Sequence, residues 1–166
     1  MRLILLTLLG LFAGCNSLSQ TTIFKNDQYH YEFEYPNDWT IKDLGQSSAD
    51  VIAPVEHPEE KERETLSVSS ETTDGMTLEQ CYKKYVSDWY YDQYQGTTVA
   101  EGDADINGRK AKWMEYQYGD KASMTTLVYL VHCGDRFFLI NTLSSSKQYP
   151  KYKERFEGIV KTFKAK

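Results

Sequence analysis

The stretch MTTLVYLVHCGDRFFLINTL, residues 124–143, predicts the centre of a β-sheet. Two runs rich in β-branched, aromatic and aliphatic residues, 124–133 and 136–143, flank the dipeptide Gly134-Asp135. Such residues are enriched in strands, and a glycine-containing dipeptide between two strands is typical of a tight hairpin turn. The stretch therefore predicts two long antiparallel strands.

The segments on both sides of this hairpin extend the same pattern. Residues 97–106 and 109–118 are strand candidates joined by Asn107-Gly108, which is a strong hairpin signal. Residues 149–163 predict a closing helix, because their apolar residues share one face at helical spacing. These residues are Tyr152, Phe156, Ile159, Val160 and Phe163.

Residues 77–94 predict a long helix. Thr77 and Gln80 form a capping box at its start, and Gly96 follows its end. The apolar stripe consists of Leu78, Cys81, Tyr82, Tyr85, Val86 and Trp89. At about 100° per residue, Trp89 belongs to this buried stripe.

Three tyrosines of the same segment are expected on the polar side of the helix. They are Tyr90, Tyr91 and Tyr94. Because tyrosine is enriched in protein interfaces, these rings are a candidate docking patch for a partner. The alternative is structural: the helix frays after Trp89, or a neighbouring loop covers the rings.

The N-terminal half is also β-rich. Residues 29–35, YHYEFEY, alternate aromatic and polar side chains, as expected of a half-buried strand. Residues 39–41, 51–55 and 66–70 are shorter strand candidates. The order of strands, helix, two hairpins and helix predicts a single α+β domain with a mainly antiparallel sheet.

The N-terminal stretch LLTLLGLFAGCNS, residues 5–17, resembles part of a bacterial lipoprotein signal peptide. Its apolar run is too short to span a bilayer, and Phe12-Ala13-Gly14-Cys15 resembles a lipobox. On this interpretation residues 1–14 are removed, Cys15 carries the lipid, 15–22 form a tether and 23–166 form the domain. The alternative is an ordinary signal peptide with a chance cysteine.

The net charge of −5 bears on the class of partner. A negative domain without a basic stripe is a poor candidate for nucleic-acid binding. The expected partners are the membrane, through the lipid on Cys15, and an unidentified protein.

Two stretches carry a further resemblance. FEYPNDWTI, residues 33–41, and GDRFFLINTLSSSKQYPKYKERFEGIVKTFK, residues 134–164, resemble the PsbP-like family, over about residues 23 to 164. That family includes extrinsic photosystem II subunits and many bacterial lipoproteins. The resemblance implies a central antiparallel sheet with helices on both sides, an α/β/α sandwich. It also implies a binding or assembly factor rather than an enzyme, and it carries no functional residue set onto this chain.

Few residues of the chain suggest metal or cofactor chemistry. DADING, residues 103–108, matches the first half of an EF-hand loop, but Met114 stands at the twelfth position and the same Asn-Gly explains a hairpin. His30, His57 and His132 share no ligand spacing. No cofactor or metal is therefore expected.

Motifs of nucleophilic catalysis are missing as well, because the sequence holds no G-x-S-x-G, H-E-x-x-H or C-x-x-C. Cys81 and Cys133 either pair as a disulfide, as in many exported proteins, or stay as two buried free thiols. The sequence leaves both open.

These observations predict a membrane-anchored exported lipoprotein that acts as a non-enzymatic protein-binding or assembly factor. A second hypothesis is a carrier of a small ligand or metal, with a pocket between the sheet and a helix. A hydrolase with an unrecognised site is a third.

Overall fold

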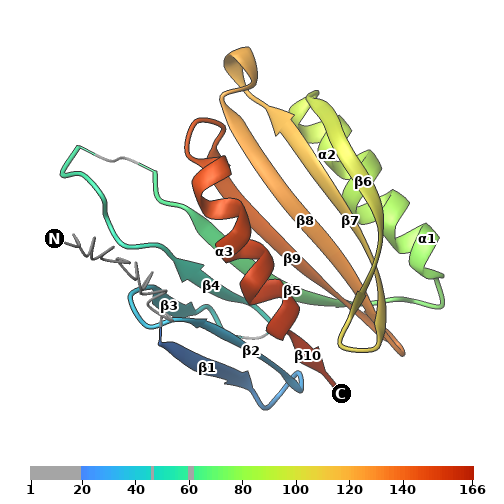
Figure 1. The fold of residues 1–166 in the computed structure, drawn as a ribbon. Helices are drawn as coiled ribbons and strands as arrows, with labels where there is room; N and C mark the ends of the chain where they lie inside the picture. Colours follow the sequence, from blue (N-terminus) through green and yellow to red (C-terminus); the bar gives the residue numbers. More distant parts are fainter. Residues whose placement is uncertain (1–19, 46, 60–61) are drawn as a thin grey trace, which may run out of the picture.

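The central element of the fold is a seven-stranded antiparallel sheet. The computed structural model describes residues 20–45, 47–59 and 62–166. The strands follow the order β3-β4-β5-β9-β8-β7-β6, and every neighbouring pair is antiparallel. Their bounds are β3 (Thr40–Asp43), β4 (Ala49–Ile52), β5 (Thr65–Thr72), β6 (Thr97–Ile106), β7 (Arg109–Tyr118), β8 (Met124–Cys133) and β9 (Arg136–Ser145). The four longest strands form the two predicted hairpins (Figure 1).

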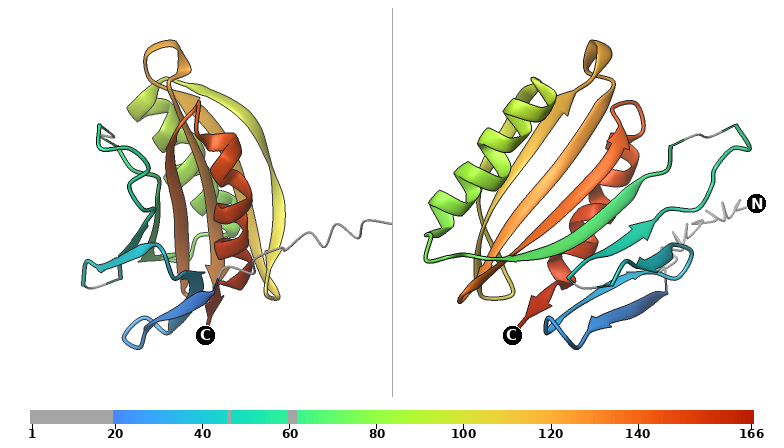
Figure 2. Two further views of the ribbon diagram at one scale, coloured as in Figure 1. Left: turned by 60° about the vertical axis from the view of Figure 1, so that its left-hand side comes forward. Right: turned by 180° about the vertical axis from the view of Figure 1, so that it is seen from behind.

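Helices cover both faces of this sheet, which confirms the predicted α/β/α arrangement. Helix α3 (Tyr149–Thr162) lies on one face. The other face carries α1 (Leu78–Tyr82), a π-helical turn η1 (Lys83–Ser87) and α2 (Asp88–Tyr94), which run on as one helix (Figure 2). We call the two sides the α3 face and the α2 face.

Period-two alternation in β8 sends its side chains to both faces. Leu127 and Val131 join the cluster beneath α3, whereas Val128 and Leu130 join the cluster beneath α2. Because a strand places successive side chains on opposite sides, a nearly continuous apolar run fits a strand that is buried on both faces.

A second, three-stranded sheet lies beside the main one. It consists of β1 (Thr21–Asn26), β2 (Tyr31–Pro36) and β10 (Lys164–Ala165), in the order β1-β2-β10. The expected tether over 15–22 is therefore wrong at its end, because Thr21 and Thr22 pair with Pro36 and Tyr35.

The strand predicted over 29–35 begins two residues later in the structure than expected. Tyr29 and His30 lie in the β1–β2 turn, where His30 adopts a φ of 54°. The strand itself begins at Tyr31.

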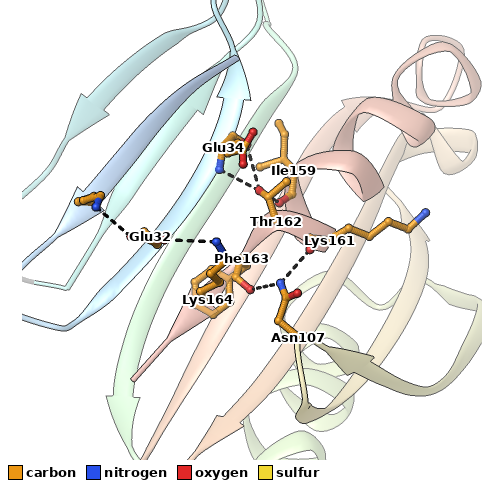
Figure 3. A network of polar contacts seen from close by, with 9 residues as sticks. Glu32, Glu34, Asn107, Ile159, Lys161, Thr162, Phe163 and Lys164 are labelled. Carbon is orange, nitrogen blue, oxygen red and sulfur yellow. Dashed lines mark hydrogen bonds and ion pairs between the residues drawn. The ribbon is translucent and has the colours of Figure 1, made fainter. Parts of the chain in front are cut away.

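A polar network joins the small sheet to the end of α3 (Figure 3). The Thr162 hydroxyl accepts a hydrogen bond from the Glu34 backbone N–H at 2.8 Å. The Asn107 amide donates to the carbonyls of Lys161 and Phe163 at 2.9 and 2.8 Å. Asn107 thus satisfies carbonyls that the helix end leaves without intrahelical donors.

The start and end of the long helix follow the sequence signals. Thr77 and Gln80 form the reciprocal hydrogen bonds of a capping box. Gln95, in the left-handed conformation, ends α2. The next residue, Gly96, has no room for a side chain, because a Cβ there would meet the Gln117 carbonyl oxygen at 2.1 Å.

The predicted lipidation site, Cys15, and the signal peptide over 1–14 lie outside the described residues. Within the part of the chain that the structure describes, no helix is long and apolar enough to span a membrane.

Candidate functional site

A groove opens on the α2 face, beside the helix. The α1–α2 helix lies over one part of the sheet and leaves β5 uncovered (Figure 2). On β9 it buries Phe137, whereas Leu139 and Asn141 are only partly buried. Between this helix and the two strands lies a cavity of about 350 Å³. That volume is at the small end of the range for ligand sites.

Strand β5 supplies a polar side to the groove. Ser67, Ser69 and Glu71 line it from alternate positions of the strand. Leu66 and Val68, on either side of Ser67 in the chain, are buried on the α3 face. The alternation of LSVSSE thus places small hydroxyl groups on the uncovered face.

The floor of the groove includes Asn141 of β9, which pairs with Ser67 across the strands. Its Oδ1 accepts hydrogen bonds from the hydroxyls of Tyr90 and Thr126, at 2.7 and 2.6 Å. Burial raises the pKa of Tyr90 well above its ordinary value, so the hydroxyl stays protonated and able to donate. The two donors therefore fix the orientation of the Asn141 amide.

The helix side of the groove is aromatic and consists of Tyr85, Trp89 and Tyr90. Tyr90 is only 5% exposed, whereas Trp89 is 43% exposed. The expectation that Trp89 belongs to the core and Tyr90 to the solvent-facing side is therefore wrong.

The π-helical turn over Lys83–Ser87 explains this reversal. A π turn holds about one residue more than an α turn, so it rotates the following residues by about 100° relative to a regular helix. Tyr90 takes the inward position that a regular helix would give to Trp89.

The candidate docking patch is accordingly smaller than expected. Tyr91 and Tyr94 are exposed at 65% and 41%, respectively, but Tyr90 is buried and is no longer part of the patch. Tyr94 stacks on Tyr118 with ring centroids 4.3 Å apart, so its position is partly fixed by β7.

A second hollow, of about 630 Å³, lies beside Tyr91. Asp88 and Asp92 line it together with Tyr91. This side of α2 therefore combines an exposed aromatic ring with negative charge.

Cys81 and Cys133, the cysteines within the described residues, are free, buried thiols. Cys81 belongs to the cluster beneath α2 and Cys133 to the cluster beneath α3, so the sheet separates them. The disulfide alternative is thus wrong in this structure. Burial raises the pKa of both thiols, which makes them poor nucleophiles.

The hairpin interpretation of residues 103–108 is confirmed. Asn107 and Gly108 form the β6–β7 turn with φ values of 50° and 80°, as expected of a hairpin. Among the described residues, no three His, Cys, Asp or Glu side chains gather as a metal site would require.

The second hypothesis from the sequence includes a pocket between the sheet and a helix, but the residues that line the groove were not predicted. One signal was present: β5 alternates apolar residues with Ser67 and Ser69 rather than with charged residues. The polar Asn141 within the apolar run of β9 was a second signal.

Two solved structures share the fold at low sequence identity. The solution structure of cyanobacterial PsbP (CyanoP) from Synechocystis sp. PCC 6803 is 16% identical, with a TM-score of 0.65, and the match covers 95% of this chain and 100% of that one. The crystal structure of LpqN, described as involved in cell envelope biogenesis of Mycobacterium tuberculosis, is 12% identical, with a TM-score of 0.67 and coverage of 87% and 89%.

A third similar structure is a Pseudomonas aeruginosa protein of unknown function, described as a putative regulator. It is 14% identical, with a TM-score of 0.61 and coverage of 86% of this chain and 94% of that chain. None of the curated proteins matches this chain. The model of the family described as PsbP matches residues 19–165, which is nearly the whole of the described domain. The chain therefore belongs to the PsbP family.

Proposed function

We propose that the mature protein is a non-enzymatic accessory factor, held at a membrane by a lipid on Cys15, that binds a protein partner on the outer side of α2. The observation that carries this proposal is the exposure of Tyr91 on that side, beside Asp88 and Asp92. Tyr94, which contacts Tyr118 and Trp89, is also partly exposed. Large aromatic side chains are enriched in protein interfaces, because the ring buries apolar area and the hydroxyl tolerates water.

The charge beside Tyr91 indicates the kind of partner. Asp88 and Asp92 line the same hollow, although Asp88 also pairs with Lys83 at 3.0 Å. A partner segment that combines a basic side chain with an apolar one complements this surface. Because exposed charges are screened by salt, binding should weaken as the salt concentration rises.

The membrane anchor rests on the sequence Phe12-Ala13-Gly14-Cys15. Two or more acyl chains give a stable anchor. Changing Cys15→Ser should move the protein from the membrane fraction to the soluble fraction. Continued tight membrane association of that variant would contradict the proposed anchor.

The non-enzymatic role is supported by the catalytic features that the described residues lack. Both thiols are buried, and no cluster of metal-ligating side chains exists among the described residues. The sequence holds none of the serine-nucleophile or metalloprotease motifs. Binding and assembly factors are also what the PsbP-like resemblance implies.

Site-specific photocrosslinking in intact membranes tests the docking surface. A photoreactive residue at position 91 should yield one adduct with a single partner. The matched control is position 154, because Glu154 is exposed on α3, on the opposite face of the sheet. The same adduct at position 154, or no adduct at position 91, would contradict the proposal.

A double variant adds a test of affinity. Tyr91→Ser with Tyr94→Ser should abolish capture of the crosslinked partner. Tyr91→Ser alone should weaken capture and leave the thermal midpoint nearly unchanged, because it is Tyr94 that stacks on Tyr118 and meets Trp89. Loss of capture by Tyr91→Ser together with a large fall in the midpoint would instead show that this ring is structural.

A further inference from the structure

The groove beside Trp89 is separate from the docking surface around Tyr91. Trp89 lines the groove against β5 and β9, whereas Tyr91 lines the hollow toward Gly96 and Thr97. Trp89 and Tyr91 thus lie on different sides of the same helix, and a variant of Tyr91 leaves the groove in place. Tyr94 is different, because its ring contacts Trp89 with centroids 5.6 Å apart.

The polar groups of the groove are regularly spaced. Ser67 and Ser69 lie two residues apart on β5, so their side chains stand about 7 Å from each other on one face. They pair across the strands with Asn141 and Leu139, respectively. The sheet side of the groove therefore presents two hydroxyls, one amide and the aliphatic side chains of Val128 and Leu139, besides Glu71.

The Asn141 amide is ready to donate. Its Oδ1 already accepts from Tyr90 and Thr126, so its two N–H groups remain for a ligand. Because Tyr90 is 5% exposed and packed in the core, the amide is held in place before any ligand arrives.

Trp89 supplies an aromatic platform at the other side of the groove. Its ring meets Tyr90 and Tyr94 edge to face, with centroids 5.0 and 5.6 Å apart and interplanar angles of 78° and 79°. These contacts hold the indole in one orientation while 43% of the side chain stays exposed. A preorganised ring of this kind loses little entropy on binding.

The charged groups that line the groove indicate which classes of ligand it disfavours. Glu71 is the one charged group among the described residues that line it. A lone carboxylate disfavours phosphates, nucleic acids and other anions. A purely apolar ligand is disfavoured as well, because it would cover the hydroxyls and the amide without giving them hydrogen-bond partners.

We propose that the groove binds a neutral saccharide of one or two sugar rings. A pyranose has an apolar face of C–H bonds, which fits the negative face of an indole, and a rim of hydroxyl groups. The C–H face stacks on Trp89. The rim hydroxyls accept from the Asn141 amide, exchange hydrogen bonds with Ser67 and Ser69, and donate to Glu71.

Binding of the full-length mature chain to immobilised neutral, N-acetylated and acidic oligosaccharides tests this proposal. A neutral or N-acetylated class should be retained, and acidic glycans should not. In a titration with the retained glycan, Trp89→Ala should weaken binding at least about tenfold and Trp89→Phe should restore part of the loss. Tyr91→Ala, on the other side of the helix, should bind as the unaltered protein does.

A second readout does not depend on affinity alone. The side-chain amide signals of Asn141, assigned by their loss in Asn141→Leu, should shift when the glycan is added. Three results would each overturn the proposal. No neutral glycan is retained, Trp89→Ala binds the glycan as tightly as the unaltered protein does, or the groove is found to bind a peptide. A failure of the Tyr91 crosslink would leave it untouched, because that experiment probes the protein-docking surface.

Discussion

The two faces of the central sheet differ in how completely they are covered. On the α3 face, helix α3 and the small sheet pack an aromatic cluster in which Phe33, Phe156 and Phe163 are buried almost completely. On the α2 face, the helix covers a smaller cluster and leaves a polar groove beside it. The α3 face is thus closed by packing, whereas the α2 face keeps accessible polar surface beside its helix.

The polar side chains on the two faces of the sheet differ in the same way. Tyr149 on the α3 face donates to the buried carboxylate of Glu115 at 3.0 Å, and Lys153 pairs with the same carboxylate at 2.7 Å. This network is satisfied within the protein. On the α2 face, the amide of Asn141 is fixed from inside and still faces a cavity. A buried, satisfied network serves packing, whereas convergent groups in a cavity serve a ligand.

Raising the pH has the largest expected effect, because both faces bury tyrosines. Burial raises the pKa of Tyr31 and Tyr129 on the α3 face, and of Tyr118 on the α2 face, to about 12. Their contribution to stability is complete below the unfolded pKa of about 10 and is lost as the pH rises through the folded pKa. We therefore expect the free energy of unfolding to fall from about pH 10 and the chain to unfold by about pH 12.

Tyrosinate absorbance and circular dichroism, followed together, measure this transition. If the two faces unfold as one unit, both signals should change in a single step. An earlier step limited to the α2 face would show that the α1–α2 layer opens independently. Complete ionisation near pH 10 in a protein that is still folded would contradict the assigned burial.

Truncation of a core ring on the α3 face has the next largest effect. Phe156 is 0% exposed and meets the ring of Trp39 edge to face at 5.9 Å. Phe156→Ala should lower the free energy of unfolding by about 3–5 kcal/mol, measured by urea denaturation. Phe137→Ala, in the cluster beneath α2, should cost less, because its surroundings beside the groove can relax. A larger loss at Phe137 would reverse the comparison.

The parts of the fold that the sequence predicts are those with a local cause. The hairpins around Asn107-Gly108 and Gly134-Asp135 follow from period-two patterns and turn residues, and strands β6, β7 and β8 have the predicted bounds. Strand β1 was not predicted, because its residues are mostly exposed and only pairing with β2 holds them in a sheet. Strand β10 depends in the same way on β2.

The candidate site depends on a feature without a local signal. The π turn at Lys83–Ser87 shifts the following residues by one position, so Tyr90 takes the inward place expected for Trp89, and a helical projection at a fixed angle cannot include this shift. The hydrogen bond from Tyr90 to Asn141 joins residues 51 positions apart. Tertiary packing on the sheet, rather than residue spacing, thus selects which ring faces inward.

A change at Asn141 tests the polar network beneath the groove. In Asn141→Leu, the buried Tyr90 hydroxyl loses its acceptor, and an unsatisfied buried group costs about 1–3 kcal/mol. Adding Tyr90→Phe removes the stranded hydroxyl and should recover part of that loss. Urea denaturation of the two single variants and the double variant measures the coupling. Strictly additive losses would show that the two side chains do not depend on each other.

Trp89→Ala should have the smallest effect on stability and is the sharpest test of the π turn. In a regular helix Trp89 would be a core residue, and its truncation would cost about 3–5 kcal/mol. Because the side chain is 43% exposed and its ring contacts are with Tyr90 and Tyr94 at the surface of the cluster, we expect a loss below about 1 kcal/mol. Tyr90→Ala, one residue further along, should show the large loss instead. Urea denaturation of both variants measures the two losses. A larger loss for Trp89→Ala than for Tyr90→Ala would show that Trp89 is the core residue, as in a regular helix. The expected order would show that the π turn places Tyr90 in the core and leaves the Trp89 indole partly exposed beside the groove.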